Sequence, residues 1–138
     1  MPGLEGTDRY GNPLLTLPGD GCHRSRRTVY HEGFHIFQYR ATSAGFEYTG
    51  NSQWFIEASA QWYMARKNLQ DPEMYIEASC ICENPHLALW HTLENGDPSD
   101  PRDWLFMCRL YALNTWLVFL TEVAGVDPAV VTDGFYQS

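Results

Sequence analysis

His31-Glu32-Gly33-Phe34-His35 carries two histidines four positions apart, with an acid directly after the first. On an α-helix, residues at this spacing lie on one face and can bind a single metal ion. Glu32 would then stand beside the ion, where a carboxylate can take a proton from water that the ion activates. The pattern predicts a helix that carries half of a zinc site. The alternative is a surface helix with two solvated histidines and one acid.

A third ligand is expected from the stretch Trp54-Phe55-Ile56-Glu57-Ala58-Ser59-Ala60-Gln61-Trp62. Its aromatic and small residues recur at offsets of three and four, which is typical of a buried helix. Glu57 is the single carboxylate in this apolar stretch, and a buried charge needs a partner. A zinc ion would be such a partner. The alternative is that Glu57 faces water or pairs with Arg40 or Arg66.

These two stretches together resemble the gluzincin class of zinc metallopeptidases, of which thermolysin is a familiar member. A bacterial-style variant of that class reads Thr-Val-x-His-Glu-x-x-His-x-x-Gln, followed by Trp-x-x-Glu-x-x-Ala-x-Trp. The chain matches this variant over residues 28–63, at Thr28, Val29, His31, Glu32, His35, Gln38, Trp54, Glu57, Ala60 and Trp62. The resemblance implies that His31, His35 and Glu57 bind zinc. It also implies that Glu32 is the general base.

The chain departs from the resembling family in two ways. An Asp four positions after the ligand Glu supports a zinc-bound histidine in that family, and Gln61 stands at this position here. A glutamine carbonyl can accept the same hydrogen bond without charge, so we expect Gln61 to support a histidine but to give weaker metal binding. Such peptidases also carry a β-sheet ahead of the motif helix, whose edge strand holds the substrate, and only residues 1–24 precede it here.

Hydrolysis of the kind that the resemblance implies needs a donor that stabilises the oxyanion. In the resembling family a Tyr opens a late amphipathic helix that ends near a Gly. Tyr111, in a stretch that ends at Gly125, is therefore the first candidate for this donor. His86 and His91 are further candidates for oxyanion or substrate contacts. The alternatives are a core tyrosine and two packed or exposed histidines.

The resemblance implies a peptide or protein substrate, and two other readings stay open. The same zinc site could cleave an ester or a non-peptide amide, because the short upstream region offers a peptide little strand to pair with. The chain could also be a non-catalytic zinc-binding fragment whose metal stabilises the fold.

Composition limits the class of protein. A chain of 138 residues fits one domain with a sizeable core. Its 44% hydrophobic and 14% aromatic residues exclude a disordered chain. The net charge of −8 argues against a nucleic-acid or anionic-membrane surface, and no apolar run approaches a membrane span. An incomplete sheet would leave an apolar face that invites a homo-oligomer.

Helix signals dominate the chain. Helices are expected over residues 25–40, from Asn51 or Ser52 to 68, over 72–82, and over 101–124 with Gly125 ending the last. Asp-Pro pairs at 71–72, 100–101 and 127–128 each fit an N-cap followed by proline at the first helical position. We expect a mainly α, compact helical zincin-like catalytic domain over residues 1–138, with at most a small N-terminal β element. Residues 1–24 form a loop or strand lead-in, in which Leu14 to Leu17 could be a strand, and residues 25–138 form the helical core.

Four cysteines, Cys22, Cys80, Cys82 and Cys108, allow two disulfides. Cys80 and Cys82 are too close to bridge each other, so each would pair with Cys22 or Cys108. The alternative is four reduced thiols. The even count leans weakly toward a secreted, oxidising location, whereas the polar start of the chain offers no apolar signal segment. The localisation therefore stays unknown from sequence.

Overall fold

The computed structural model describes residues 3–7, 9–10, 13–16, 25–41, 53–83, 85–86 and 108–134. Helices dominate this part of the chain, which confirms the mainly α fold class. The elements are β1 (Gly3–Thr7), β2 (Pro13–Thr16), α1 (Ser25–Ala41), α2 (Gln53–Arg66), the 3-10 helix η2 (Pro72–Tyr75), α3 (Ala78–Glu83), α5 (Asn114–Val118), the π-helical η3 (Phe119–Val123) and α6 (Ala129–Asp133). Residues 108–112 are also helical and lead into α5.

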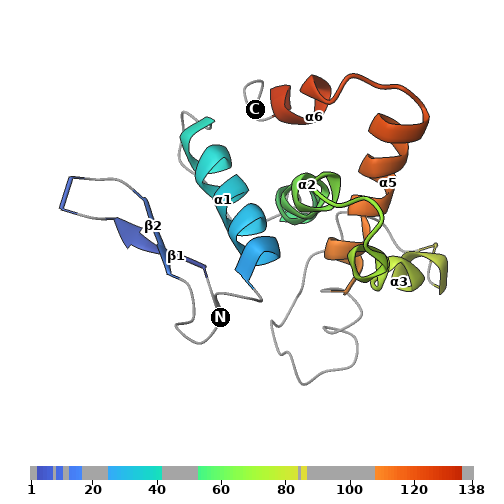
Figure 1. The fold of residues 1–138 in the computed structure, drawn as a ribbon, viewed down its shortest axis with the longest axis horizontal. Helices are drawn as coiled ribbons and strands as arrows, with labels where there is room; N and C mark the ends of the chain where they lie inside the picture. The colour runs from blue at the N-terminus through green and yellow to red at the C-terminus, as the bar shows by residue number, and fades with distance from the viewer. Residues whose placement is uncertain are drawn as a thin grey trace.

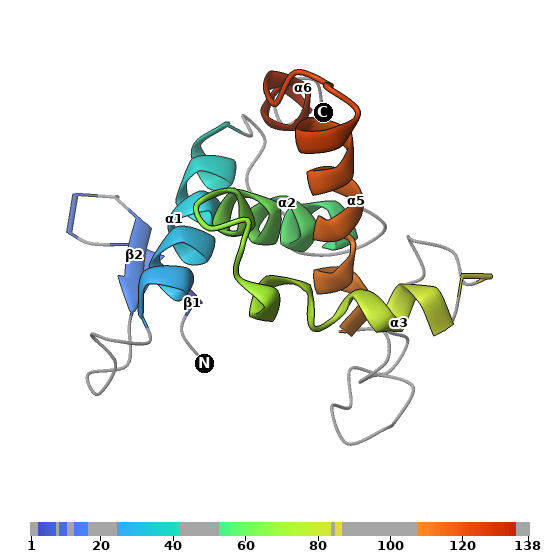
Figure 2. The same cartoon turned by 45° about the vertical axis from the view of Figure 1, so that its right-hand side comes forward.

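β1 and β2 form a two-stranded antiparallel hairpin, the small N-terminal β element that the sequence predicts. Gly3 pairs with Thr16 and Leu4 with Leu15, and the register shifts before Thr7 pairs with Pro13. Both strands lie in the stretch expected to be a loop or strand lead-in, and β1 forms by backbone pairing with β2 without any hydrophobic alternation. The hairpin contacts α1 and lies on the opposite side of it from α2 (Figures 1 and 2).

α2 lies between α1 and α5 and forms the centre of the core (Figure 1). Small residues on α2, such as Ala58 and Ala60, are fully buried and let the neighbouring helices approach closely. Phe34 from α1 packs edge-on against Trp62, with ring centroids 6.2 Å apart. The remaining buried core residues are Ile56, Met64, Ala65, Leu113, Leu117, Val118 and Val131. The sequence of α2 is apolar almost throughout because the helix is buried on most of its surface.

Thr121 joins η3 to α2. Its hydroxyl accepts a hydrogen bond from Trp62 Nε1 at 3.0 Å and donates to the backbone carbonyl of Leu117 at 3.0 Å. A threonine that bonds to the carbonyl four residues earlier perturbs a helix, and Thr121 lies within the π-helical turn Phe119–Val123. Arg66 on α2 binds Glu122 in the same turn, with Nε 2.6 Å from Oε1.

The helix predicted over residues 72–82 is split into η2 and α3. Tyr75 packs against the main core, whereas Cys80 belongs to a second cluster with Cys108 and Ala112. On a straight helix these two side chains would point about 140° apart. A break between them therefore lets each reach its own part of the core.

The long helix predicted over residues 101–124 is also interrupted. Residues 101–107 lie outside the described part of the chain, and the turns tighten at Leu113, whose carbonyl accepts from Trp116 N at 3.1 Å. The predicted end is confirmed, since Gly125 has a φ of 75° and Val126 N donates to Leu120 O at 2.9 Å. Asp127 then caps α6 as predicted, accepting from Ala129 N at 2.8 Å.

A disulfide joins Cys80 on α3 to Cys108, so the alternative of four reduced thiols is wrong. Cys82 is exposed with a free thiol, and Cys22 lies outside the described residues.

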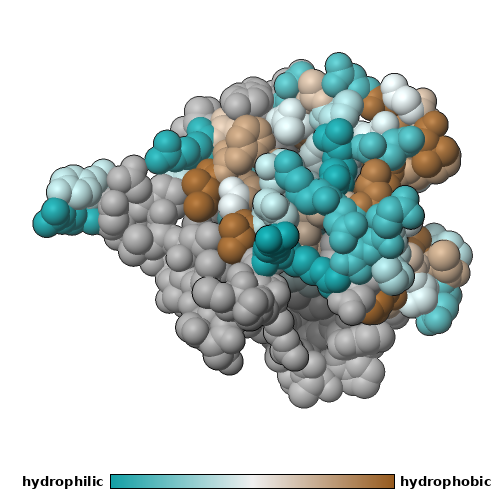
Figure 3. Space-filling model, in the orientation of Figure 1, coloured by the Kyte–Doolittle hydropathy of each residue, from teal (hydrophilic) through white to brown (hydrophobic). Residues whose placement is uncertain are grey.

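The hydrophobic residues on the face in Figure 3 form separate patches among hydrophilic ones. Within the described segments, no helix has both the length and the apolar character that crossing a membrane requires.

Candidate metal centre

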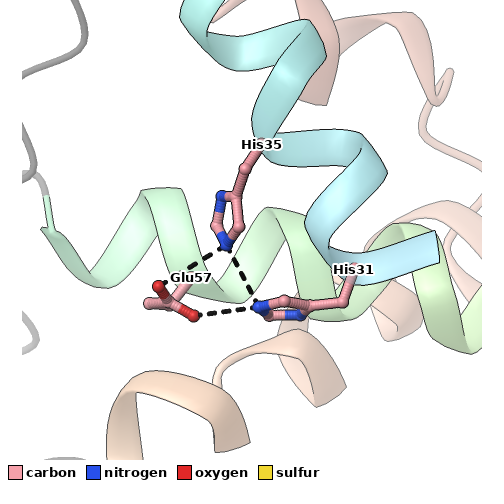
Figure 4. Close-up of side chains that lie close together, drawn as sticks. All are labelled: His31, His35 and Glu57. Atoms are coloured by element: carbon pink, nitrogen blue, oxygen red, sulfur yellow. Dashed lines mark hydrogen bonds and ion pairs between the residues drawn. The ribbon is translucent and has the colours of Figure 1, made fainter. Parts of the chain in front are cut away.

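His31 and His35 on α1 point toward Glu57 on α2, and the three side chains meet between the two helices (Figure 4). The two Nε2 atoms are 3.1 Å apart. Glu57 Oε2 lies 3.2 Å from His31 Nε2, and Oε1 lies 3.6 Å from His35 Nε2. In a tetrahedral zinc site with bonds of about 2.0–2.1 Å, neighbouring donor atoms are about 3.3–3.4 Å apart. One donor atom from each of the three residues lies within 4.8 Å of the other two, so the cluster could hold a metal ion such as zinc.

All three side chains are buried, with exposed fractions of 9% for His31, 6% for His35 and 3% for Glu57. Burial lowers the pKa of His35, although the nearby Glu57 carboxylate opposes this shift. A lowered pKa keeps the imidazole neutral, which is the form that binds metals. With both imidazoles in the neutral form that binds metals, an ionised Glu57 would leave a negative charge in the interior, and a divalent cation would compensate it.

Gln38 holds His35 in the orientation that metal binding needs. Its Oε1 lies 2.6 Å from His35 Nδ1, so His35 donates there and leaves the Nε2 lone pair directed at the cluster. The Nε2 amide of Gln38 donates to Ile56 O and to Ser59 Oγ, both at 2.9 Å. Gln38 is fully buried, and its bonds reach residues on either side of Glu57. One side chain thus positions a histidine and also fixes α1 against α2.

The support predicted for Gln61 is not found in the described part of the chain. Gln61 is half-buried and makes no hydrogen bond there to either histidine. His31 Nδ1 is buried and has no hydrogen-bond partner among the same residues. The sequence did contain a signal for Gln38, because a glutamine three positions after His35 lies on the same helical face. Its role was nevertheless missed.

Glu32 lies half-buried beside the cluster. Burial raises the pKa of its carboxyl, the neighbouring His31 lowers it, and Glu57 raises it. Glu32 directly follows His31 and is half-buried, so it stays next to a candidate ligand while it keeps access to solvent. Its position suits a group that exchanges protons at the edge of a metal site.

Tyr111 comes to the cluster from the helical residues 108–112, far along the chain. Its ring centroid lies 5.9 Å from that of His31. Burial raises the pKa of Tyr111 well above its ordinary value, and Glu57, Glu32 and a hydrogen bond to Glu57 raise it further. The phenol therefore stays protonated and remains a donor. The structure thus brings the first candidate for the oxyanion donor to the predicted ligands.

The other predicted positions lie elsewhere. His86 is exposed in the turn at residues 85–86 and makes no hydrogen bond or ring contact with the cluster in the described segments. His91 lies outside the described residues. Arg66 binds Glu122 and is therefore not the partner of Glu57.

No family model, no curated protein and no solved structure matches this chain.

Proposed function

We propose that this protein is a zinc-dependent hydrolase and that it acts as a metallopeptidase. The observation that carries the proposal is the meeting of His31, His35 and Glu57 at zinc-like spacing in a buried position. Two nitrogen donors and one carboxylate are a ligand set of catalytic zinc sites, in which the fourth position takes water or substrate. When bound, zinc would polarise a substrate carbonyl and acidify water.

Two of the three proposed ligands, His35 and Glu57, are held by interactions that do not depend on the metal. Gln38 fixes the tautomer of His35, and the interior between α1 and α2 keeps Glu57 away from bulk water. Preorganisation of this kind reduces the reorganisation that metal binding costs. The deep burial of Glu57 also strengthens its attraction for a cation, because screening by water is weak there.

Glu32 is the general base of the proposed reaction. It is half-buried at the rim of the cluster, so its carboxylate can reach both a water molecule and solvent. It takes a proton from the attacking water and delivers it to the leaving amine. Tyr111 donates a hydrogen bond to the oxyanion, a role for which it must stay protonated, as its raised pKa ensures.

Hydrolysis of an ester or a non-peptide amide is the second candidate. It is favoured by the position of the β1–β2 hairpin, which lies on the far side of α1 from α2 (Figures 1 and 2). Within the described segments this hairpin is the only sheet, so no strand there borders the cluster to pair with an extended peptide.

The test is a comparison of the zinc-loaded wild type with Glu32→Gln on a mixture of unstructured peptides and on small activated esters. We expect peptide cleavage by the wild type and loss of at least about a hundredfold in Glu32→Gln, because general-base catalysis contributes about 10²–10⁴-fold. Glu83→Gln, an exposed carboxylate on α3, is the matched control and should keep full activity. Ester cleavage without peptide cleavage supports the second candidate, and full activity of Glu32→Gln contradicts both.

A further inference from the structure

A cavity lies beside α1, on a different face of that helix from His31 and His35. It is a cavity of about 520 Å³ between α1, the C-terminal part of α2 and the start of α6. Five aromatic side chains line it, namely Tyr30, Phe34, Phe37, Trp62 and Tyr63. None of the candidate metal ligands is among the lining residues, because on α1 positions 30, 34 and 37 face away from positions 31 and 35. The cavity is therefore distinct from the metal centre.

Gly33 shows that this cavity is open space rather than a packing gap. It lies on the cavity wall, and a Cβ atom built on it would meet no atom within 4 Å among the described residues. The rings form a preorganised wall, with Phe34 stacked on Tyr63 at 5.0 Å and tilted against Phe37 at 5.2 Å. Cavities of about 300–1,000 Å³ with apolar walls are typical of small-molecule sites.

Positive charge gathers at the rim of the cavity. Lys67, the only lysine in the sequence, holds its ammonium 4.5 Å from the Tyr63 ring centroid and 5.9 Å from that of Tyr30. Lys67 is exposed and forms no ion pair with an acid in the described part of the chain. Arg66 lines the cavity over Trp62, but Glu122 already binds its Nε. One uncompensated positive charge thus remains at the mouth of an apolar cavity.

We propose that this cavity binds a hydrophobic monocarboxylate of fatty-acid size. The hydrocarbon part lies against Tyr30, Phe37 and Tyr63, the rings of the wall that solvent reaches, and displaces water from them. The carboxylate binds at Lys67, where it meets the uncompensated charge. A cationic ligand is disfavoured, because the ring faces at the rim already bind Lys67 and Arg66. This proposal is independent of hydrolysis, since no residue of the metal centre takes part.

The test is isothermal titration calorimetry of the 138-residue chain with decanoate, decylamine and decanol, which share one hydrocarbon tail and differ in charge. We expect one decanoate per chain, bound more tightly than decanol, with decylamine weakest. Lys67→Glu removes the attraction and adds repulsion, so decanoate should bind about tenfold more weakly and decylamine more tightly. Arg9→Glu, the same charge reversal in the turn near the hairpin, is the control and should change neither affinity. Equal affinities for the three compounds would overturn the proposal.

Gly33→Leu tests the place of binding. The new side chain grows into open space, so the protein should fold, as circular dichroism checks, and should still bind zinc while decanoate binding is lost. Reductive ¹³C-methylation supplies a second readout, because Lys67 is the single lysine and its methyl signal should shift during a decanoate titration. Undiminished decanoate binding by folded Gly33→Leu, or an unmoved Lys67 signal at saturation, would contradict the proposed site.

Discussion

The side chains of the candidate metal centre are brought together by two different features, helical spacing on α1 and the packing of α2 against α1. His31 and His35 share a face of α1, whereas Glu57 reaches them only because α2 packs against that face. Gln38 links the two arrangements, since its carbonyl accepts from His35 and its amide donates to the α2 backbone. This single amide therefore determines both the tautomer of a ligand and the alignment of two helices.

Replacing Gln38 should weaken zinc binding. In Gln38→Leu, His35 Nδ1 loses its partner, and the change of a residue that supports a metal-bound histidine typically costs 10–100-fold in affinity. The buried Nδ1–H of His35 is then left without an acceptor, so we expect a loss of about 1–3 kcal/mol in the free energy of unfolding. Competition with a zinc chelator and denaturant unfolding measure the two effects.

Gln61 supplies the matched control for this experiment. Gln61→Leu removes an amide of the same size that makes no hydrogen bond to either histidine within the described segments, so zinc affinity should stay within about twofold. If Gln61→Leu weakens zinc binding as strongly as Gln38→Leu, the assignment of support to Gln38 is wrong.

Tyr111 should matter more for turnover than for metal binding. Tyr111→Phe keeps the ring near His31 and removes only the hydroxyl. If that hydroxyl stabilises the oxyanion, kcat at saturating zinc should fall about 10²–10³-fold. Zinc affinity should fall by no more than about 10–100-fold, through the lost hydrogen bond to Glu57. Steady-state kinetics with a peptide substrate, paired with zinc titration, separates this result from a general loss of structure. An unchanged kcat would remove Tyr111 from the reaction.

At the scale of the element, strong local signals gave correct predictions. The sequence predicts α1 and the C-terminal stop at Gly125, because helical periodicity and capping chemistry are local properties. It misses the split between η2 and α3, since that break depends on which part of the core receives Tyr75 and Cys80. It also misses the bond from Gln38 to His35, because the partner atoms of a buried amide depend on packing between helices.

The disulfide ties the segment that carries Tyr111 to α3, and its loss should destabilise the protein. Cys80 and Cys108 are separated by 28 positions, and closing a loop of this size contributes about 3–4 kcal/mol in the chain-entropy account. We therefore expect Cys80→Ser with Cys108→Ser to lower the melting temperature by many degrees. Cys82→Ser, which removes an exposed free thiol on the same helix, should leave it unchanged. Equal melting temperatures for the wild type and the double variant would contradict the bond's role.

At the scale of the whole molecule, metal binding should couple to folding and to pH. Zinc that binds only the folded state stabilises it by about 2.7 kcal/mol at a free concentration one hundred times Kd. The two histidines must be neutral to bind zinc, and burial already lowers the pKa of His35. The zinc-dependent stability should therefore be present at and above neutral pH and disappear as acid protonates the histidines. Thermal unfolding with and without zinc, between pH 5 and 8, measures whether the stabilisation by zinc falls as the pH falls.

We propose that three side chains from two helices form one zinc site, and the metal content of the purified protein is the most direct test of this site. Mass spectrometry of the purified wild type should find about one zinc per chain. Glu57→Gln, which keeps the shape but removes the buried charge, should lose most of it, whereas Glu83→Gln on the surface of α3 should retain it. A wild type that holds no zinc even after zinc is supplied, or a Glu57→Gln variant that binds it as tightly, would contradict the account.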